Sequence, residues 1–374
     1  MEGSARGSKE DRRTLFAVSK QRRGSNVPSM NIERVAVVGA TGYSGEELVR
    51  LLIRHPGVEL AALTSRQDAG RTLGTVYPKF AGQRWAGLEF IESDVTAIVG
   101  SGARFVFLAL PHGVAAEFAK PLVAAGLRVL DLSADFRIKD AAVFEEFYGA
   151  PPHAPELVAM SVYGLPEIHR EAIRTAQLVA CPGCYPTSVT LPLHPLLRER
   201  LLDPTSIAIS SVSGVSGAGR TAKTDYLFAE CNESVRAYSV PKHRHLAEIE
   251  QELSAAAGEP VLVSFTPHLM PVTRGIHTTI YASPAAGVDG SRIGAALEKA
   301  YSGEPFVRLL GESGCPDTKH VTFTNFIDIA WRFDVRTGRV LLLSAEDNLV
   351  KGAAGQAVQC LNLMCGWPET TALL

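Results

Sequence analysis

The chain has 374 residues, of which 46% are hydrophobic and 20% are charged, and its formal net charge is -2. Such a composition is typical of a globular protein of two or three compact units. It excludes long disorder, a collagen-like array and a membrane-spanning protein, and the near-neutral charge gives no electrostatic footprint for nucleic acid. Six cysteines are too sparse for the disulfide framework of a small secreted domain, so we expect a cytoplasmic protein.

The first 29 residues differ in charge from the rest of the chain. They contain seven Lys or Arg and three acids, which makes this segment +4 and the remainder -6. They lack the apolar segment of a secretory signal. A basic leader that contains serines would also be compatible with a plastid transit peptide, although Glu10 and Asp11 argue against one. We predict a disordered leader or extension that ends before Met30.

Residues 30–180 are predicted to form a dinucleotide-binding domain. An apolar run at 32–38, a helical pattern at 46–53 and a second apolar run at 58–63 make one βαβ unit. Further strands are expected at 105–110 and 127–132, with a helix at 114–125 between them. Continuous apolar strands are typical of a buried parallel sheet, so the fold class is α/β with a Rossmann-type, doubly wound sheet.

From about residue 205 the pattern changes to strands with longer connections. We predict an α+β catalytic and dimerisation domain over residues 181–345, because a largely antiparallel sheet is a common surface for pairing of subunits. A homodimer or homotetramer is therefore expected. Residues 348–364 then predict a final helix. The strands expected in this part of the chain are 206–212, 261–265, 277–281 and 340–343.

A glycine-rich loop joins the first strand to the first helix. The pattern Gly39-x-x-Gly42-x-x-Gly45 lets the backbone turn tightly and approach a pyrophosphate, which the amide groups of the following helix would bind. Its second glycine comes one residue later than in the standard fingerprint, but the βαβ context favours a cofactor loop over an ordinary turn. The residues expected to bind cofactor here are Gly39, Thr41, Gly42, Tyr43, Ser44 and Gly45.

The end of the second strand bears on the choice of cofactor. NAD enzymes normally place an acidic residue here for the ribose 2′-hydroxyl, whereas this chain has Ser65 and Arg66. A hydroxyl and a guanidinium suit a 2′-phosphate, so NADP(H) is the expected cofactor. Asp68 lies close enough in sequence to keep NAD as an alternative.

Cys184 is the candidate nucleophile. It follows the apolar run 178–180 and precedes another apolar segment, so the turn Cys181-Pro182-Gly183-Cys184 leads from a strand into a helix. A helix N-terminus lowers the pKa of a thiol. The base is expected in the cluster His243-Arg244-His245, with His245 preferred over His243. Glu248 lies three residues after His245 on a predicted helix and is expected to orient its imidazole.

Seven ordered motifs together resemble the N-acetyl-γ-glutamyl-phosphate reductases of the aspartate-semialdehyde dehydrogenase superfamily, from about residue 32 to the C-terminus. Cys181 departs from that family, which usually has Asn there. The motifs are Gly-Ala-Thr-Gly-Tyr-Ser-Gly (39–45), Leu-Pro-His-Gly (110–113), Pro-Gly-Cys-Tyr-Pro-Thr (182–187), Ser-Gly-Val-Ser-Gly-Ala-Gly-Arg (213–220), His-Arg-His (243–245), Pro-His-Leu-Met-Pro-Val-Thr-Arg-Gly-Ile (267–276) and Asp-Asn-Leu-Val-Lys-Gly-Ala-Ala-Gly-Gln-Ala (347–357).

The resemblance implies a reaction and roles for particular residues. Cys184 would attack an acyl phosphate to form a thioester, which NADPH would reduce to a semialdehyde, with His245 as the acid/base partner. The final helix would return to the first domain, so that residues 346–374 complete it. Cofactor contacts are implied at Pro111, Ser216, Gly217 and Asn348, and substrate contacts at Ser133, Arg137 and Arg220.

Other readings of the same residues stay open at this point. Cys181, Cys184, His243 and His245 have spacings that a zinc site permits, although no second Cys pair supports one. The pair Tyr238-x-x-x-Lys242 matches that of short-chain reductases, but Pro241 would break the helix that this pair needs. A dinucleotide-sensing module without catalysis, and related reductases of aspartyl phosphate or N-acetyl-aminoadipyl phosphate, are further alternatives.

Overall fold

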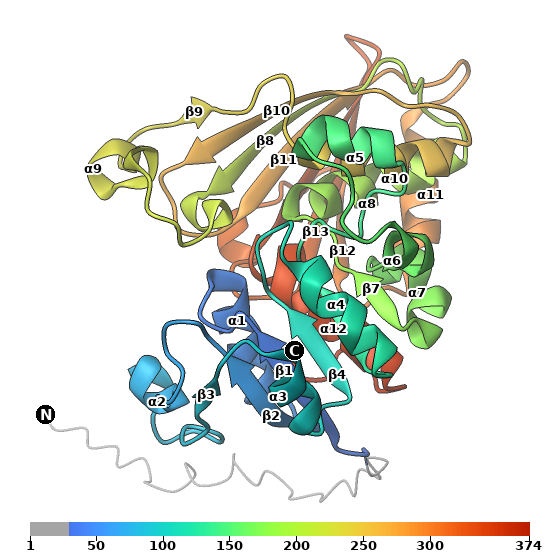
Figure 1. Cartoon of the computed structure of the whole chain (residues 1–374). Helices are drawn as coiled ribbons and strands as arrows, with labels where there is room; N and C mark the ends of the chain where they lie inside the picture. Colours follow the sequence, from blue (N-terminus) through green and yellow to red (C-terminus); the bar gives the residue numbers. More distant parts are fainter. Residues whose placement is uncertain (1–29) are drawn as a thin grey trace, which may run out of the picture. The chain divides into compact units, whose positions relative to one another are not determined.

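Two seven-stranded sheets organise the part of the chain that the computed structural model describes, residues 30–374 (Figure 1). The leader predicted for residues 1–29, and with it the transit-peptide alternative, lies outside the described residues. Both sheets belong to one unit that spans residues 32–374. No helix in the described range combines the length and the apolar character that crossing a membrane requires.

The first sheet is entirely parallel, and its central strands are buried because helices cover both faces. The predicted Rossmann-type α/β fold is confirmed. In spatial order its strands are β3 (Phe90–Ile91), β2 (Val58–Thr64), β1 (Glu33–Val38), β4 (Phe105–Leu108), β5 (Arg128–Asp131), β7 (Leu178–Ala180) and β6 (Val162–Tyr163). The helices of this region are α1 (Tyr43–Leu52), α2 (Leu73–Val76), η1 (Pro78–Phe80), α3 (Val95–Gly100), α4 (Ala115–Ala124), α5 (Ala141–Tyr148), α6 (Pro155–Met160) and α7 (Pro166–Thr175).

The second sheet is mixed, and four of its six strand pairs are antiparallel, as predicted; β12–β13 and β8–β10 are parallel. Its strands are β12 (Val307–Gly311), β13 (Ile327–Asp334), β14 (Arg339–Glu346), β11 (Ile276–Ala282), β8 (Ala208–Gly214), β10 (Ser264–Met270) and β9 (Arg236–Ala237). The helices of this region are α8 (Cys184–Arg198), η2 (Val215–Ala218), η3 (Thr224–Tyr226), α9 (Phe228–Cys231), α10 (His245–Ala257), α11 (Gly290–Tyr301) and η4 (Thr318–His320).

Helix α8 lies on β11 and β14, α11 covers β12 and β13, and α10 packs against α8. Alternation along β11 buries Ile276 and Ile280 under these helices, while Thr279 and Tyr281 point to the opposite face. The core of this half therefore lies between one face of the sheet and the three helices. The prediction of a strand at 261–265 was wrong at its start, because the amide of Val261 donates to the Ser254 side chain rather than to a neighbouring strand.

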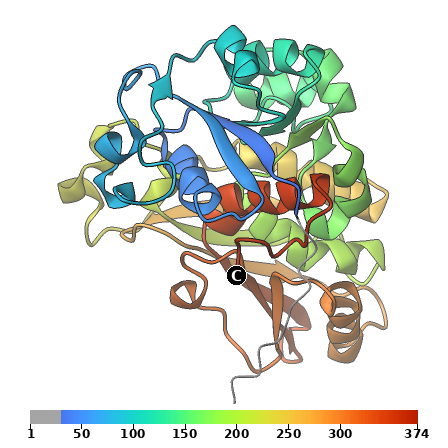
Figure 2. The ribbon, with the colours of Figure 1, turned by 90° about the horizontal axis from the view of Figure 1, so that it is seen from below.

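The last helix of the chain lies on the first sheet. After β14, a π-helical turn η5 (Val350–Ala354) leads into α12 (Gly355–Met364), so the helix predicted for 348–364 is regular only in its second part. Helix α12 packs on α7, α1 and β5, and Figure 2 shows it in red beside the blue N-terminal helix. His55 Nε2 pairs with Asn362 at 2.8 Å, and Arg128 donates to the Met364 carbonyl at 2.7 Å.

Candidate active site

The glycine loop leaves the N-terminus of α1 open. A Cβ on Gly39, whose φ is +79°, would stand 2.5 Å from the Ala109 carbonyl oxygen, and one on Gly45 would collide with the Gly39 carbonyl. These two glycines are needed for the turn itself. Gly42 is the N-cap residue of α1 and provides no side-chain cap, so the first amides of the helix are free to receive an anion.

Ser65 and Arg66 follow directly after β2. The Ser65 hydroxyl lies 3.3 Å from the Thr41 hydroxyl, which joins this turn to the glycine loop. Arg66 is exposed and has no hydrogen bond or ion pair with any other described residue. Asp68, the residue that favours NAD, is engaged by Arg71 at 2.6 Å. The turn therefore presents an unpaired guanidinium rather than a free carboxylate.

Arg220 contacts the glycine loop. It donates to the Thr41 carbonyl at 2.5 Å and to Tyr77 Oη at 3.3 Å, and its guanidinium lies 5.6 Å from the centre of the Tyr43 ring. These contacts do not support the substrate role expected for Arg220. They place this residue with the groups expected to bind cofactor.

The side chain of Asn348 hydrogen-bonds to the second glycine-rich loop, residues 213–220. Its side-chain amide donates to the Ser216 hydroxyl at 3.0 Å, and its carbonyl oxygen accepts from the amide of Gly275 at 2.8 Å. A Cβ on Gly217 would stand 3.7 Å from the Asn348 side-chain nitrogen. The three residues expected at the nicotinamide are thus brought together, whereas Pro111 lies exposed in the loop after β4.

Cys184 is the first residue of α8 and directly follows the N-cap residue Gly183. The imidazole of His245, the first residue of α10, lies against Gly183: a Cβ there would stand 2.6 Å from Nε2 and 2.8 Å from Cε1. The turn between β7 and α8 therefore carries the thiol, and the N-terminus of α10 carries the histidine beside it. The structure brings the predicted nucleophile and the preferred base together.

Burial disfavours the charged form of both groups. Burial raises the pKa of Cys184 to about 12, with a further contribution from the charge of Glu346, and outweighs the backbone hydrogen bond of Tyr185 and the charge of Arg137, which lower it. Burial also lowers the pKa of His245 well below its usual value, with His243 and Arg137 adding to the shift. A thiolate therefore requires proton transfer from the sulfur to a neighbouring acceptor rather than loss to solvent.

The prediction that Glu248 orients His245 was wrong. Glu248 is fully buried, and its carboxylate accepts from the Gly183 amide at 2.8 Å, Tyr163 Oη at 2.7 Å and Arg137 Nη1 at 3.2 Å. Nδ1 of His245 is buried and has no hydrogen-bond partner among residues 30–374. His245 and Glu248 are three residues apart, so both side chains lie on one face of α10, but the carboxylate of Glu248 points to the turn between β7 and α8. It holds the backbone that carries Cys184.

The imidazole of His243 is engaged in a local hydrogen bond. Its Nδ1 accepts the amide proton of His245 at 3.1 Å and so caps the start of α10. The ring is surrounded by Tyr185, Tyr238 and Phe265, and burial lowers its pKa to about 4. This geometry favours His245 over His243 as the base.

The loop after β5 contributes a buried guanidinium. Arg137 donates to Glu248 and, at 2.8 Å, to the Leu132 carbonyl, and its buried Nε has no partner within the described part of the chain. Ser133, also expected to contact substrate, donates its hydroxyl proton to Asp131 at 2.7 Å and accepts from the Asp135 amide. Ser133 thus orders the loop that holds Arg137.

Two alternatives from the sequence receive no support. Among residues 30–374, no three His, Cys, Asp or Glu side chains are arranged to hold a metal. The buried Cys181 lies close to Cys360, whose thiol donates to the Gly164 carbonyl at 3.4 Å. Tyr238 and Lys242 lie in an irregular loop, not on the adjacent helical turns that short-chain reductase chemistry needs.

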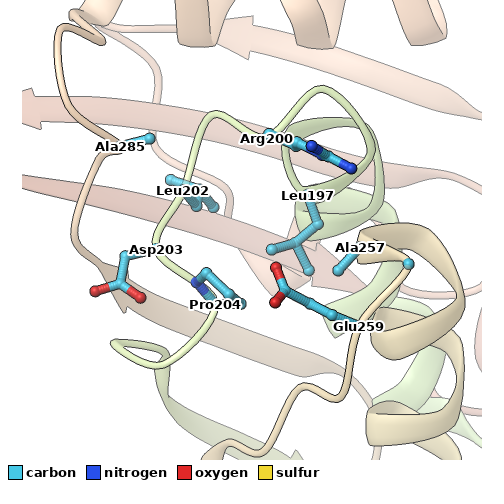
Figure 3. A pocket seen from close by; sticks show the side chains of 9 residues that line it. Leu197, Arg200, Leu202, Asp203, Pro204, Ala257, Glu259 and Ala285 are labelled. Carbon is cyan, nitrogen blue, oxygen red and sulfur yellow. The ribbon is translucent and has the colours of Figure 1, made fainter.

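A hollow of about 470 Å³ lies elsewhere in the fold (Figure 3). It is lined by Leu197, Arg200 and Glu259, among others, at the C-terminal ends of α8 and α10. At 1.5 Å per residue, the 15 residues of α8 put this hollow roughly 20 Å from Cys184 at the other end of the helix. It is therefore separate from the cysteine site.

Comparisons with known proteins agree with this geometry. Residues 34–176 match the NAD-binding domain of semialdehyde dehydrogenases, and residues 184–348 match their dimerisation domain. N-acetyl-gamma-glutamyl-phosphate reductases from Akkermansia muciniphila and Moorella thermoacetica are 58% and 52% identical over 340 residues, which cover 91% of this chain and 98% and 97% of those proteins.

Solved structures share the fold at lower identity. Aspartate semialdehyde dehydrogenase II from Vibrio cholerae superposes with a TM-score of 0.68 at 20% identity, over 89% of this chain and 98% of that one. The enzyme from Candida albicans, solved with NADP, gives 0.67 at 16% identity over the same shares. With two family models and relatives above 50% identity, this chain belongs to the N-acetyl-γ-glutamyl-phosphate reductase family of semialdehyde dehydrogenases.

Proposed function

We propose that this chain reduces N-acetyl-glutamyl 5-phosphate, with NADPH, to N-acetyl-glutamate 5-semialdehyde and phosphate, a step of arginine biosynthesis. The observation that carries the proposal is the pairing of Cys184, at the first turn of α8, with the His245 ring packed on the preceding glycine. The relatives that bear this activity in their names are 50–58% identical to the chain.

Cys184 would act as the covalent nucleophile. Its sulfur attacks the acyl carbon, the bond from that carbon to the phosphate oxygen breaks, and phosphate leaves a thioester on Cys184. Because the thiol is neutral in the free protein, His245 would take its proton as the bond forms. His245 would later return a proton to the oxygen of the reduced intermediate, whose collapse releases the aldehyde and the thiol.

The open N-terminus of α1 fits a dinucleotide pyrophosphate. Gly39, Gly42 and Gly45 would let it approach, and the amides of Tyr43 and Ser44 would bind it. Ser216, Gly217 and Asn348 would contact the nicotinamide end. When bound, NADPH supplies the hydride for the reduction.

The preference for NADP(H) over NAD(H) rests on Ser65 and on the unpaired Arg66. We expect Arg66→Ala to reduce the ratio of kcat/KM with NADP to that with NAD by about tenfold, since one charge-assisted contact to phosphate contributes roughly 1.5 kcal/mol. An unchanged ratio would remove Arg66 from this role. Arg336→Ala, at an exposed position on the β13–β14 turn, is the matched control.

Two copies of the chain would pair through the open face of the second sheet. Helices cover the other face, whereas Thr266, His268, Thr279 and Tyr281 are partly exposed on this one. We propose a homodimer or a homotetramer built from such dimers, in the cytoplasm. Replacing Thr279 by Arg should convert the assembly to monomers in sedimentation.

The decisive experiment is the reverse assay, in which N-acetyl-glutamate semialdehyde, phosphate and NADP are the substrates. Cys184→Ala should abolish turnover and also the acyl-enzyme that mass spectrometry detects on the native protein. A correctly folded alanine variant that keeps turnover within about tenfold would exclude covalent catalysis. Aspartate semialdehyde and N-acetyl-aminoadipate semialdehyde, assayed in parallel, test the two alternative substrates through their kcat/KM values.

A further inference from the structure

Glu346 is a buried carboxyl group that the mechanism above does not use. It is the last residue of β14, between β13 and β11, and has no exposed surface. Both of its carboxylate oxygens are buried, and neither has a hydrogen-bond partner among residues 30–374. A buried polar group is normally hydrogen-bonded, so an unpartnered carboxyl calls for an explanation.

This carboxyl lies next to the proposed nucleophile. Gly352, in the π-helical turn after β14, is enclosed between them: a Cβ on Gly352 would stand 3.0 Å from Glu346 Oε1 and 2.7 Å from Cys184 Cβ. The side chains of Cys184 and Glu346 therefore both lie against the same glycine. Two negative charges so close together in a buried site would repel each other strongly.

The groups around Glu346 do not neutralise it. Lys351 is fully buried, but its ammonium group donates to Glu167 at 2.6 Å and to Gln359 at 3.0 Å. Asp347 is acidic, and its carboxylate accepts from nearby backbone amides and from Arg274. Glu167 adds a further negative charge from α7. Burial, opposed only by Lys351, raises the pKa of Glu346 well above its usual value.

Other charged groups face Cys184 from the opposite side. Arg137 favours its ionisation and Glu248 opposes it, and these two are paired with each other. His245 lies across Gly183, and burial disfavours its charged form. Glu346 is therefore the unpaired acidic group that acts on the thiol, and after burial it is the largest contributor to the raised pKa of Cys184.

We propose that Glu346 is a positioning residue that controls the ionisation of Cys184, because the carboxyl and the thiol together accommodate one negative charge. The thiolate of Cys184 forms readily only while Glu346 keeps its proton, and once Glu346 ionises at alkaline pH its charge opposes that thiolate. The inference rests on Cys184 being the nucleophile of the proposed function.

The test is the pH dependence of Cys184 alkylation by iodoacetamide, followed by mass spectrometry of the peptide that contains Cys184. In Glu346→Gln no charge can develop, so we expect the midpoint for alkylation to fall by about one pH unit, a tenfold gain in thiolate below the midpoint. Glu298→Gln, on the exposed face of α11, should give the profile of the unsubstituted enzyme. Superimposed profiles for Glu346→Gln and the unsubstituted enzyme would overturn the proposal.

A second measurement needs no substitution at Glu346. If an ionised Glu346 keeps the thiol protonated, the carboxyl has to lose its proton at a lower pH than Cys184 does. The infrared band of the protonated carboxyl should therefore disappear at a pH below the midpoint for Cys184 alkylation, and a band that persists through that midpoint would refute the coupling. Neither measurement uses substrate, so its failure is distinct from failure of the reverse assay.

Discussion

At Gly183 an added methyl group should disturb side-chain packing without straining the backbone. Its φ of -69° and ψ of 159° are accessible to alanine, and its amide would still donate to Glu248 at 2.8 Å. The added Cβ, however, would stand 2.6 to 2.9 Å from three ring atoms of His245. Gly183→Ala therefore perturbs the proposed base without substituting any titrating residue.

The size of the effect follows from these distances. Carbon atoms pack at about 3.5–4.0 Å, so the imidazole has to retreat by roughly 1 Å. Overpacking of this kind costs about 1–3 kcal/mol of the free energy of unfolding. A displacement of about 1 Å in a catalytic group typically lowers the rate about 100-fold. We expect Gly183→Ala to show both losses.

The assay combines urea unfolding with kcat/KM in the reverse direction. The double variant Gly183→Ala, His245→Ala should recover the stability that Gly183→Ala loses, because the ring that the methyl group meets is gone. Gly100→Ala, at a helical position with nothing within 4 Å of the new methyl group, is the matched control and should be neutral or stabilising. Gly183→Ala with the stability and turnover of the unsubstituted enzyme would refute the placement of His245.

Three further outcomes follow from the geometry. Arg274 joins Glu47 of α1 to Asp347, so Arg274→Met should lower the free energy of unfolding in urea by about 3 kcal/mol. Arg336→Met, at an exposed position, should lower it by less than about 0.5 kcal/mol, and equal values for the two variants would contradict the bridging role. His243→Phe should lower the stability of the folded protein by about 1 kcal/mol, whereas His243→Asn should not, because only Asn can still cap α10. Thermal melts would show the difference. Burial raises the pKa of Asp131 to about 7, so the folded state keeps a proton that the unfolded chain releases near pH 4. The free energy of unfolding should therefore fall as the pH rises from 4 to 7. Asp131→Asn should flatten that slope, which urea titrations at several pH values would measure.

Local patterns were sufficient for the elements that define the cofactor loop and the nucleophile turn. The strand before Gly39, the helix after Gly45 and the position of Cys184 between β7 and α8 each follow from a few adjacent residues. The second sheet was harder to delimit. Its strand β10 starts at Ser264 because side chains of α10 take up the preceding amides, and such contacts leave no periodic signal.

The partners of the site residues could not be read from spacing. Glu248 and His245 share a helix face, but the groups that Glu248 binds come from residues 137, 163 and 183, all far away in sequence. Arg220 reaches the glycine loop across 179 residues. Glu346 had no sequence signal, since an acidic residue before an Asp-Asn pair suggests a turn in solvent. The position of Gly352 between Glu346 and Cys184 exists only in the folded chain.

The return of α12 to the first sheet has a consequence for folding during synthesis. All ten residues of this helix are buried, and they cover α1, α7 and β5, whose residues leave the ribosome much earlier. Until residues 355–364 emerge, the parallel sheet keeps an uncovered apolar face. The nascent chain therefore carries a surface that favours chaperone binding for most of its translation, and a truncation that removes α12 should yield aggregated protein rather than a smaller folded domain.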